Sequence, residues 1–404
     1  MFGMALYHMG SLIQSDKRFA LPGEPDEPYD WWLAALDVFE TGENLPSRTG
    51  GLAAISTFSD IAEDWRMAIA WGRTLVSLAD AKVTHMRALA RQGAPVDEYC
   101  YRPNTSPFPM SEPNWPLDSP FAVIAAARPP VSRRMSLYSA SAHEVMTLAM
   151  DQFSRGIFHM PHPHYPHSQN PHAYSPALPA TPRRSFSPSP HLSARRMSTP
   201  PVGDTSASFS RPRELFNIAT DVLGVAERLE DGTQRAYWAQ WAESVLTQMK
   251  MEADMENWRA SLAAARGRCW LVMGEAIVEQ LEDALERGEE GVLRSEEAKE
   301  AREDLVKAVD LFERAKDAEA KAGINLIPLT RGERKSDVKE LLAEALLSRA
   351  NLEEDEERRE ALYARAAREL CEAGSAVSLP SREEWEAQQR GAVDGDGDDK
   401  MDLS

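Results

Sequence analysis

Apolar residues recur every three or four positions over much of this chain, which is the spacing of an amphipathic α-helix. Two clear examples are the runs Leu215, Ile218, Ala219, Val222, Leu223, Ala226 and Leu305, Ala308, Val309, Phe312, Ala315. No segment alternates convincingly between apolar and polar residues, as a half-buried strand would. The pattern therefore predicts an all-α protein.

Small residues recur at fixed places within these helical patterns, as they do in helical-hairpin repeats of the tetratricopeptide type. Partial matches to the first helix of such a hairpin surround Gly10, Gly72 and Gly274, and a further match runs from Ala343 to Ala350 with Tyr363 and Ala366 following. Matches to the second helix are Ala35-x3-Phe39-x2-Gly42 and Ala308-x3-Phe312-x2-Ala315. A small residue where two helices cross lets their axes approach to about 8–10 Å, and bulky partners fill the space around it. We therefore expect irregular tetratricopeptide-like hairpin repeats, an α-solenoid, with an irregular helical bundle as the alternative.

Charge and proline divide the chain into unlike parts. Residues 157–213 hold twelve prolines and ten serines but a single acid, so they offer little to bury and predict a disordered insert. We expect helical repeats before it at residues 1–156, which include a Pro-rich loop at 101–120, and after it at residues 214–375. A short helix and an acidic tail are expected at residues 376–404.

Composition excludes several classes of function. The 404 residues carry a net charge of −19, which repels phosphate backbones and makes direct nucleic-acid binding unexpected. The longest small apolar stretch, Phe121–Ala127, is too short to span a bilayer. Three cysteines far apart in sequence cannot form a disulfide framework, which fits a reducing compartment.

The strongest candidate for chemistry is a group of five histidines. They are His159, His162, His164, His167 and His172. Imidazoles at this density can bind Zn²⁺ or Ni²⁺, but these alternate with prolines and have no acids or cysteines nearby to complete and orient a site. The motifs of phosphate-binding loops and nucleophile elbows are not evident. We therefore expect no enzyme activity, no metal and no cofactor.

A second candidate is a polar stripe on the helix predicted for Trp65–Lys82. Arg73 and Asp80 are seven residues apart and so share one face, while Trp71 and Leu75 belong to the apolar stripe. We consider Arg73 and Asp80 candidate residues of a partner-binding groove. Solvated surface residues are the alternative interpretation.

Several segments resemble one protein family. Residues 65–80 (WRMAIAWGRTLVSLAD), together with residues 2–10 and 215–249, resemble the fungal enhancer-of-translation-termination family, and residues 345–366 (ALLSRANLEEDEERREALYARA) are similar too. The resemblance covers about residues 1–100 and 214–375, and it rests on packing motifs. It implies an all-helical, tetratricopeptide-like protein of the nucleus or cytoplasm. It also implies that the protein binds the translation-termination machinery or a prolyl-hydroxylase-like oxygenase and regulates it.

We therefore expect a non-enzymatic adaptor that acts by binding other proteins, with neither nucleic acid nor membrane as a direct partner. A nuclear-import or chaperone-type adaptor is the alternative within the same class. From a different class, the rival is a metal-dependent hydrolase that uses the histidine-rich tract.

Overall fold

The computed structural model describes residues 1–44, 65–92, 108, 115–128, 136–161, 209–250, 252, 255–287, 289, 291–322 and 338–373. Within these ranges the regular structure is α-helical, with short 3-10 turns and no β-strand, which confirms the predicted all-α class. None of the helices in these ranges combines the length and the apolar character needed to cross a membrane.

Eleven α-helices account for most of the described residues. They are α1 (Phe2–Ser15), α2 (Pro28–Asn44), α3 (Trp65–Arg91), α4 (Pro120–Ala127), α6 (Ala142–His159), α7 (Arg211–Ala226), α8 (Gly232–Met249), α9 (Arg259–Glu286), α10 (Glu296–Ala322), α11 (Val338–Asn351) and α12 (Glu356–Ala373).

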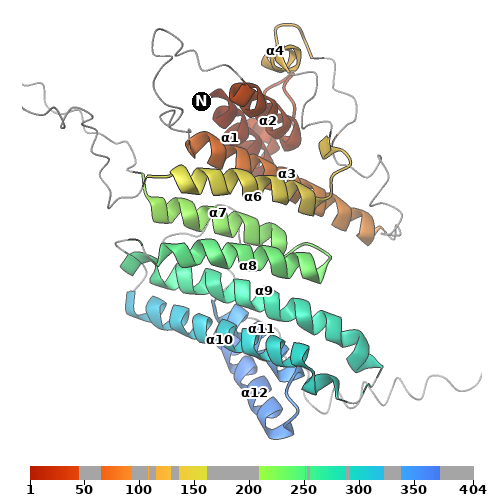
Figure 1. The fold of residues 1–404 in the computed structure, drawn as a ribbon, viewed down its shortest axis with the longest axis vertical. Coiled ribbons are helices and arrows are strands. Elements are labelled where there is room, and N and C mark those ends of the chain that lie inside the picture. Colours follow the sequence, from red (N-terminus) through yellow and green to blue (C-terminus); the bar gives the residue numbers. More distant parts are fainter. Residues whose placement is uncertain are drawn as a thin grey trace, which may run out of the picture.

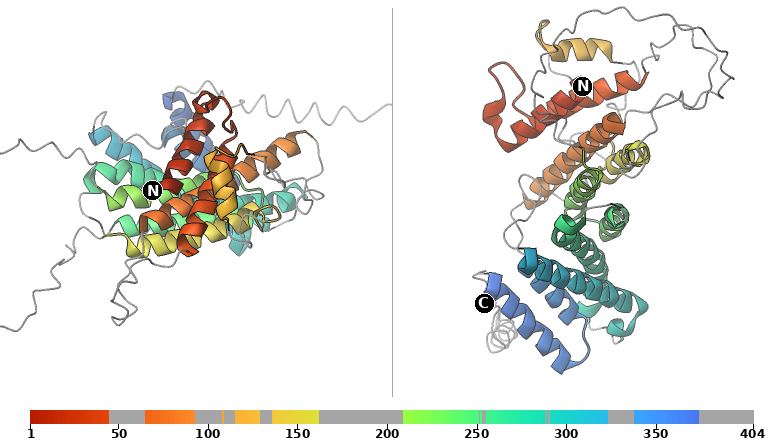
Figure 2. Two further views of the ribbon diagram at one scale, coloured as in Figure 1. Left: turned by 90° about the horizontal axis from the view of Figure 1, so that it is seen from above. Right: turned by 90° about the vertical axis from the view of Figure 1, so that its left-hand side faces the viewer.

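Ten of these helices pair into five hairpins: α1 with α2, α3 with α6, α7 with α8, α9 with α10, and α11 with α12. The hairpins follow one another along the long axis of the molecule, from α1 and α2 at one end to α12 at the other (Figure 1). The first helices of successive hairpins also contact one another, from α1 through α3, α7 and α9 to α11. Figure 2 shows the same stack from its side, and α4 packs on α2 at one end.

The hydrophobic core runs through the stack as three clusters. The first joins α1 to α6 with residues of α7 and α8, including Ile218, Val222 and Trp238. The second unites α7, α8 and α9, and the third unites α9 to α12. The helices before and after the predicted insert therefore share one core, so apolar burial holds the two predicted repeat regions together.

Glycines at the crossing points fix how the helices of a hairpin approach each other. In α1 and α2, a Cβ added at Gly3 would lie 2.7 Å from the Phe39 ring, and one added at Gly10 would lie 2.7 Å from the Trp32 ring. Because real Cβ atoms essentially never come this close, only glycine fits at these two positions without a shift of its neighbours. The prediction of a small residue at the crossing near Gly10 is thus confirmed.

The same arrangement recurs in two other hairpins. A Cβ at Gly72 of α3 would lie 2.6 Å from Phe153 of α6. In α9, a Cβ at Gly267 would lie 2.7 Å from Phe312 of α10, and one at Gly274 would lie 2.9 Å from Leu305. The glycines on α1 and on α9 are seven residues apart, and so are their large partners on the second helix. Each pair is antiparallel with the same stagger.

One second-helix motif was missed by sequence reasoning. Helix α6 carries Ala149-x3-Phe153-x2-Gly156, which has the spacing of the motifs predicted on α2 and α10. Gly156 faces Ile69 of α3, where an added Cβ would lie 2.5 Å from its side chain. The motif went unnoticed because it lies at the border of the proline-rich segment.

The structure also corrects the limits of the predicted insert. Helix α6 continues to His159 and α7 begins at Arg211, so the prediction of disorder is wrong for residues 157–159 and 211–213. The composition of the whole segment hid a local helix start, because Ser210 caps α7 by accepting a hydrogen bond from a first-turn amide. Residues 162–208 and 374–404 lie outside the described residues.

The Pro-rich loop predicted at residues 101–120 lies mostly outside the described ranges. Its last residue, Pro120, begins α4, with Ser119 as the N-cap. Phe108 is buried against Tyr29 of α2, and Trp115 stacks on Phe121 with ring centroids 4.8 Å apart.

Candidate functional site

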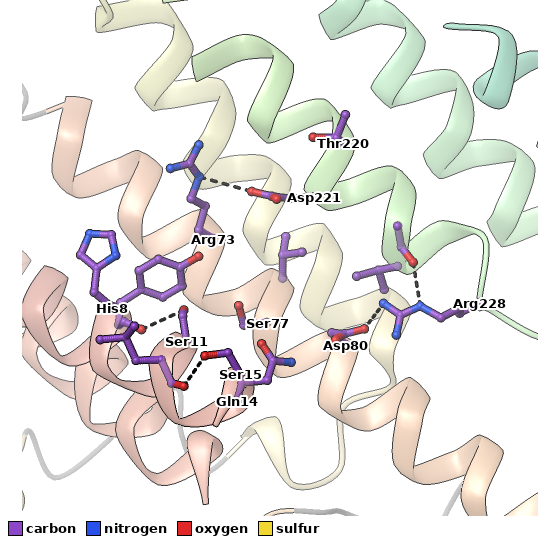
Figure 3. Close-up of a pocket in the computed structure, with 15 residues that line it drawn as sticks. His8, Ser11, Gln14, Ser15, Arg73, Ser77, Asp80, Thr220, Asp221 and Arg228 are labelled. Atoms are coloured by element: carbon purple, nitrogen blue, oxygen red, sulfur yellow. Dashed lines mark hydrogen bonds and ion pairs between the residues drawn. The ribbon is translucent and has the colours of Figure 1, made fainter. Parts of the chain in front are cut away.

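A cleft of about 710 Å³ opens between α1, α3 and α7, the first helices of three successive hairpins (Figure 3). Helix α1 contributes one polar wall. Its polar side chains are Tyr7, His8, Ser11, Gln14 and Ser15. The volume is within the range of sites that hold small ligands or short peptide segments.

Three ion pairs join α3 to α7 and to the turn that follows it. Arg73 Nε lies 3.3 Å from Asp221 Oδ2, and its Nη2 donates to Glu214 Oε2 at 3.1 Å. At the other end of the polar stripe on α3, Asp80 pairs with Arg228, whose Nε also donates to the Gly224 carbonyl at 2.8 Å. Arg73 precedes Asp80 by seven residues on α3, whereas Asp221 of α7 precedes Arg228, in the turn after α7, by seven residues, so the pairs Arg73–Asp221 and Arg228–Asp80 are reciprocal.

Both residues singled out from the sequence line this cleft. Arg73 and Asp80 do share one face of α3, and Trp71 and Leu75 on its apolar face are fully buried, as predicted. Sequence reasoning missed their partners on α7 and in the turn after it, because these are distant in sequence: Glu214 lies 141 residues after Arg73. That the two residues contact a partner protein stays a prediction.

The carboxylates and guanidinium groups that line the cleft are equal in number. Asp80 and Asp221 contribute the carboxylates, and Arg73 and Arg228 the guanidinium groups. Glu214, outside the cleft lining, adds a second carboxylate to the ion pair of Arg73.

The two aromatic side chains of the α1 wall stay neutral near physiological pH. Burial raises the pKa of the Tyr7 hydroxyl, and the Asp221 carboxylate raises it further against the opposing effect of Arg73. Burial also lowers the pKa of His8, and the positive charge of Arg73 adds to that effect. The wall thus offers neutral hydrogen-bonding groups, which suit an amide backbone better than a second charge.

The histidines considered for metal binding are only partly described. His159 is exposed at the end of α6, and His162, His164, His167 and His172 lie outside the described residues. His143, also on α6, accepts a hydrogen bond at Nδ1 from Trp238 Nε1 at 3.1 Å and so ties α6 to α8. In the ranges that the structure covers, no three His, Cys, Asp or Glu side chains are grouped so as to hold a metal ion.

Comparison of the chain with protein-family models, with curated proteins and with solved structures finds no match.

Proposed function

We propose that this chain is a non-enzymatic helical-repeat adaptor of the tetratricopeptide-like kind, which binds another protein along the face formed by its first helices. The observation that carries the proposal is the cleft between α1, α3 and α7. Stacked hairpins commonly bind a partner segment on the surface formed by equivalent helices of successive repeats. The cleft occupies that position.

The repeated hairpin geometry supports the solenoid part of the proposal. Three hairpins use a glycine on the first helix against a phenylalanine on the second: Gly3 with Phe39, Gly72 with Phe153, and Gly267 with Phe312. All three phenylalanines belong to an Ala-x3-Phe-x2-small motif. An irregular bundle has no reason to repeat one contact in one sequence context, whereas a repeat array does.

For the partner, we propose the translation-termination machinery or a prolyl-hydroxylase-like oxygenase, acting in the nucleus or the cytoplasm. This rests on the resemblance of residues 2–10, 65–80 and 215–249 to the enhancer-of-translation-termination family. Each of these three segments contributes side chains to the cleft, namely Tyr7, Arg73 and Asp221 among others. The resemblance and the cleft therefore point to the same surface.

Affinity purification from cells, followed by quantitative mass spectrometry, tests this function. The tagged full chain is compared with Gln14→Trp, which fills the cleft from an exposed position, and with Glu303→Trp, a matched control on the exposed side of α10. We expect recovery of termination factors or of an oxygenase to fall about tenfold with Gln14→Trp, equivalent to 1.4 kcal/mol of binding. Recovery should be unchanged with Glu303→Trp.

Other outcomes contradict the proposal. Equal recovery with Gln14→Trp and the unmodified chain would exclude the cleft as the partner-binding site. Recovery of importins or chaperones without termination factors or an oxygenase would favour the import or chaperone alternative. Stoichiometric Zn²⁺ lost together with an activity on deletion of residues 159–172 would favour the hydrolase.

A further inference from the structure

A hydrogen bond joins the second helices of the second and third hairpins. Trp238 Nε1 of α8 donates to His143 Nδ1 of α6 at 3.1 Å. The two rings meet edge to face, with centroids 5.6 Å apart and an angle of 60° between their planes. The cleft lies between first helices, so this contact involves the other helix of each hairpin.

The direction of this hydrogen bond fixes the protonation state of His143. The nitrogen of an indole ring carries a hydrogen and can only donate. His143 Nδ1 must therefore accept, which requires that this nitrogen carry no proton. While the hydrogen bond is made, His143 is thus the neutral tautomer with its hydrogen on Nε2.

Protonation of His143 removes the acceptor and leaves the Trp238 donor without a partner. Both nitrogens of an imidazolium ring carry hydrogens, so neither can accept from the indole, whichever way the ring is turned. Trp238 is only 1% exposed, so little water reaches its N–H group in the folded protein. A buried donor that loses its acceptor costs the full desolvation penalty of that group.

Charged and titratable groups also surround His143. The Tyr237 ring of α8 lies 6.0 Å from the imidazole, and Glu144 follows His143 on α6. Lys82 of α3 acts on the Glu144 carboxylate, as His143 does. Burial lowers the pKa of Lys82 to about 8, and hydrogen bonds with Ser141 lower the pKa of Glu144. Between pH 5 and pH 7, Lys82 and Glu144 therefore both stay charged.

Two of these groups favour the protonated form of His143. The Glu144 carboxylate attracts a positive charge, and so does the face of an aromatic ring such as Tyr237. Both side chains are exposed, so solvent screens their effect. The Trp238 N–H group acts from a buried position at hydrogen-bond distance. The loss of its acceptor therefore outweighs the two favourable effects.

We propose that His143 and Trp238 form an acid-sensitive contact between the second and third hairpins, which is intact while His143 is neutral and is weakened when His143 takes up a proton. A histidine in an unfolded chain takes up its proton near pH 6.5, so the unfolded chain binds this proton more tightly than the fold does. The contact therefore stabilises the fold above about pH 6.5, and this stabilisation is lost as the pH falls below that value. Acid thus acts at the boundary between the first two hairpins and the other three.

Urea unfolding of the full chain at pH 7 and pH 5 tests the proposal. The variant is His143→Gln, whose amide oxygen can accept the indole hydrogen at both pH values. If the fold holds the proton about tenfold more weakly than the unfolded chain does, the ratio of unfolded to folded protein should rise about sixfold more in the unmodified chain than in His143→Gln. Other groups that titrate, among them His85 on α3 and Glu275 on α9, are present in both proteins, so their contributions cancel.

The matched control is His159→Gln. His159 is exposed at the end of the same helix, so its replacement removes a histidine without affecting a buried donor. The pH dependence of His159→Gln should therefore equal that of the unmodified chain.

The NMR resonances of the indole N–H groups give a second measurement, which does not require a stable variant at position 143. The variant Trp238→Phe identifies the resonance of Trp238. This resonance should move upfield in the unmodified chain as the pH falls from 7 to 5, because the hydrogen bond is lost. Trp31 is the matched control, since its Nε1 donates at 2.9 Å to the Pro25 carbonyl, an acceptor that does not titrate.

The proposal is overturned if His143→Gln and the unmodified chain show the same pH dependence, or if the Trp238 resonance moves no further than that of Trp31. It is also overturned if His159→Gln reduces the pH dependence as much as His143→Gln does. A reduction confined to His143→Gln, together with a displacement of the Trp238 resonance beyond that of Trp31, would support it.

Discussion

Replacing Arg211 should destabilise the fold by breaking the contacts that join α6, α7 and the segment after α8. Its side chain is buried at the start of α7, where Nη1 donates to the carbonyls of Ile157 and Met160 at 3.2 Å and 2.8 Å. Its Nε donates to Glu252 Oε1 at 3.0 Å, and both side chains of this ion pair are about 5% exposed. One guanidinium group therefore links the end of α6, the start of α7 and the segment after α8.

The cost of Arg211→Ala follows from these contacts. Removing one member of a buried ion pair costs about 3–5 kcal/mol, because the remaining charge stays desolvated. The carbonyls of Ile157 and Met160 also lose a charged donor, at about 1–3 kcal/mol for each acceptor that stays buried and unsatisfied. Water that enters the space vacated by the side chain offsets part of this loss. We expect the free energy of unfolding to fall by about 3 kcal/mol.

Urea unfolding followed by circular dichroism measures the effect. Arg213→Ala is the matched control, since Arg213 is exposed on the same turn and should change the free energy by less than about 0.5 kcal/mol. If Arg211→Ala lowers the free energy of unfolding by less than about 1 kcal/mol, the packing of α6 against α7 does not depend on this residue and the prediction is wrong.

Three further predictions concern other parts of the fold. Deleting residues 162–208 and joining the ends with a short Gly-Ser linker should leave the melting temperature unchanged. Deleting residues 157–213 should lower the melting temperature by several degrees, because the contacts of Arg211 are lost. Equal melting temperatures for the two deletions would contradict this prediction. Gly72→Leu should lower the free energy of unfolding, measured in urea, by about 1–3 kcal/mol, because the new side chain overlaps Phe153. The double variant with Phe153→Ala should lose less than the sum of the two single changes. Strict additivity would show that the two residues do not pack against each other. The folded protein holds the Glu275 proton up to about pH 7 and the unfolded chain only up to its ordinary pKa near 4.5, so the group lowers stability progressively as pH rises between these values. Glu275→Gln should therefore stabilise the fold at pH 8, by about 1 kcal/mol after discounting for solvent screening, and have little effect at pH 4; an equal effect at both would contradict this.

Much of the fold could be predicted from local sequence signals. Helical periodicity depends on residues within one or two turns, and every position of α7 and α10 that it predicted to be apolar and inward-facing is buried. The small residues predicted at crossings were found where α1 meets α2, where α3 meets α6 and where α9 meets α10, because only glycine fits against Trp32, Phe153 and Leu305. These signals are short in sequence and steric in origin.

What could not be predicted depends on contacts between distant segments. Arg73 was singled out, but nothing in its neighbourhood points to Glu214 or Asp221, which lie beyond the proline-rich segment. Arg211 was placed in a disordered segment because composition was averaged over its surroundings. Its role depends on the carbonyls of Ile157 and Met160, which the sequence does not place near it.

The packing of the hairpins also determines which side chains reach the cleft. Successive residues of an α-helix are separated by about 100° around its axis, so a crossing glycine that is held against the second helix turns the next residue to the neighbouring side. Ser11 follows Gly10 in this way and, like Arg73, it lines the cleft, while Arg268 and Glu275 take the same position on α9. The glycines that allow close packing therefore also set the rotation of each first helix. A sequence search for polar residues that directly follow a crossing glycine would have found Ser11 and Arg73 of the cleft, together with Arg268 and Glu275 of α9.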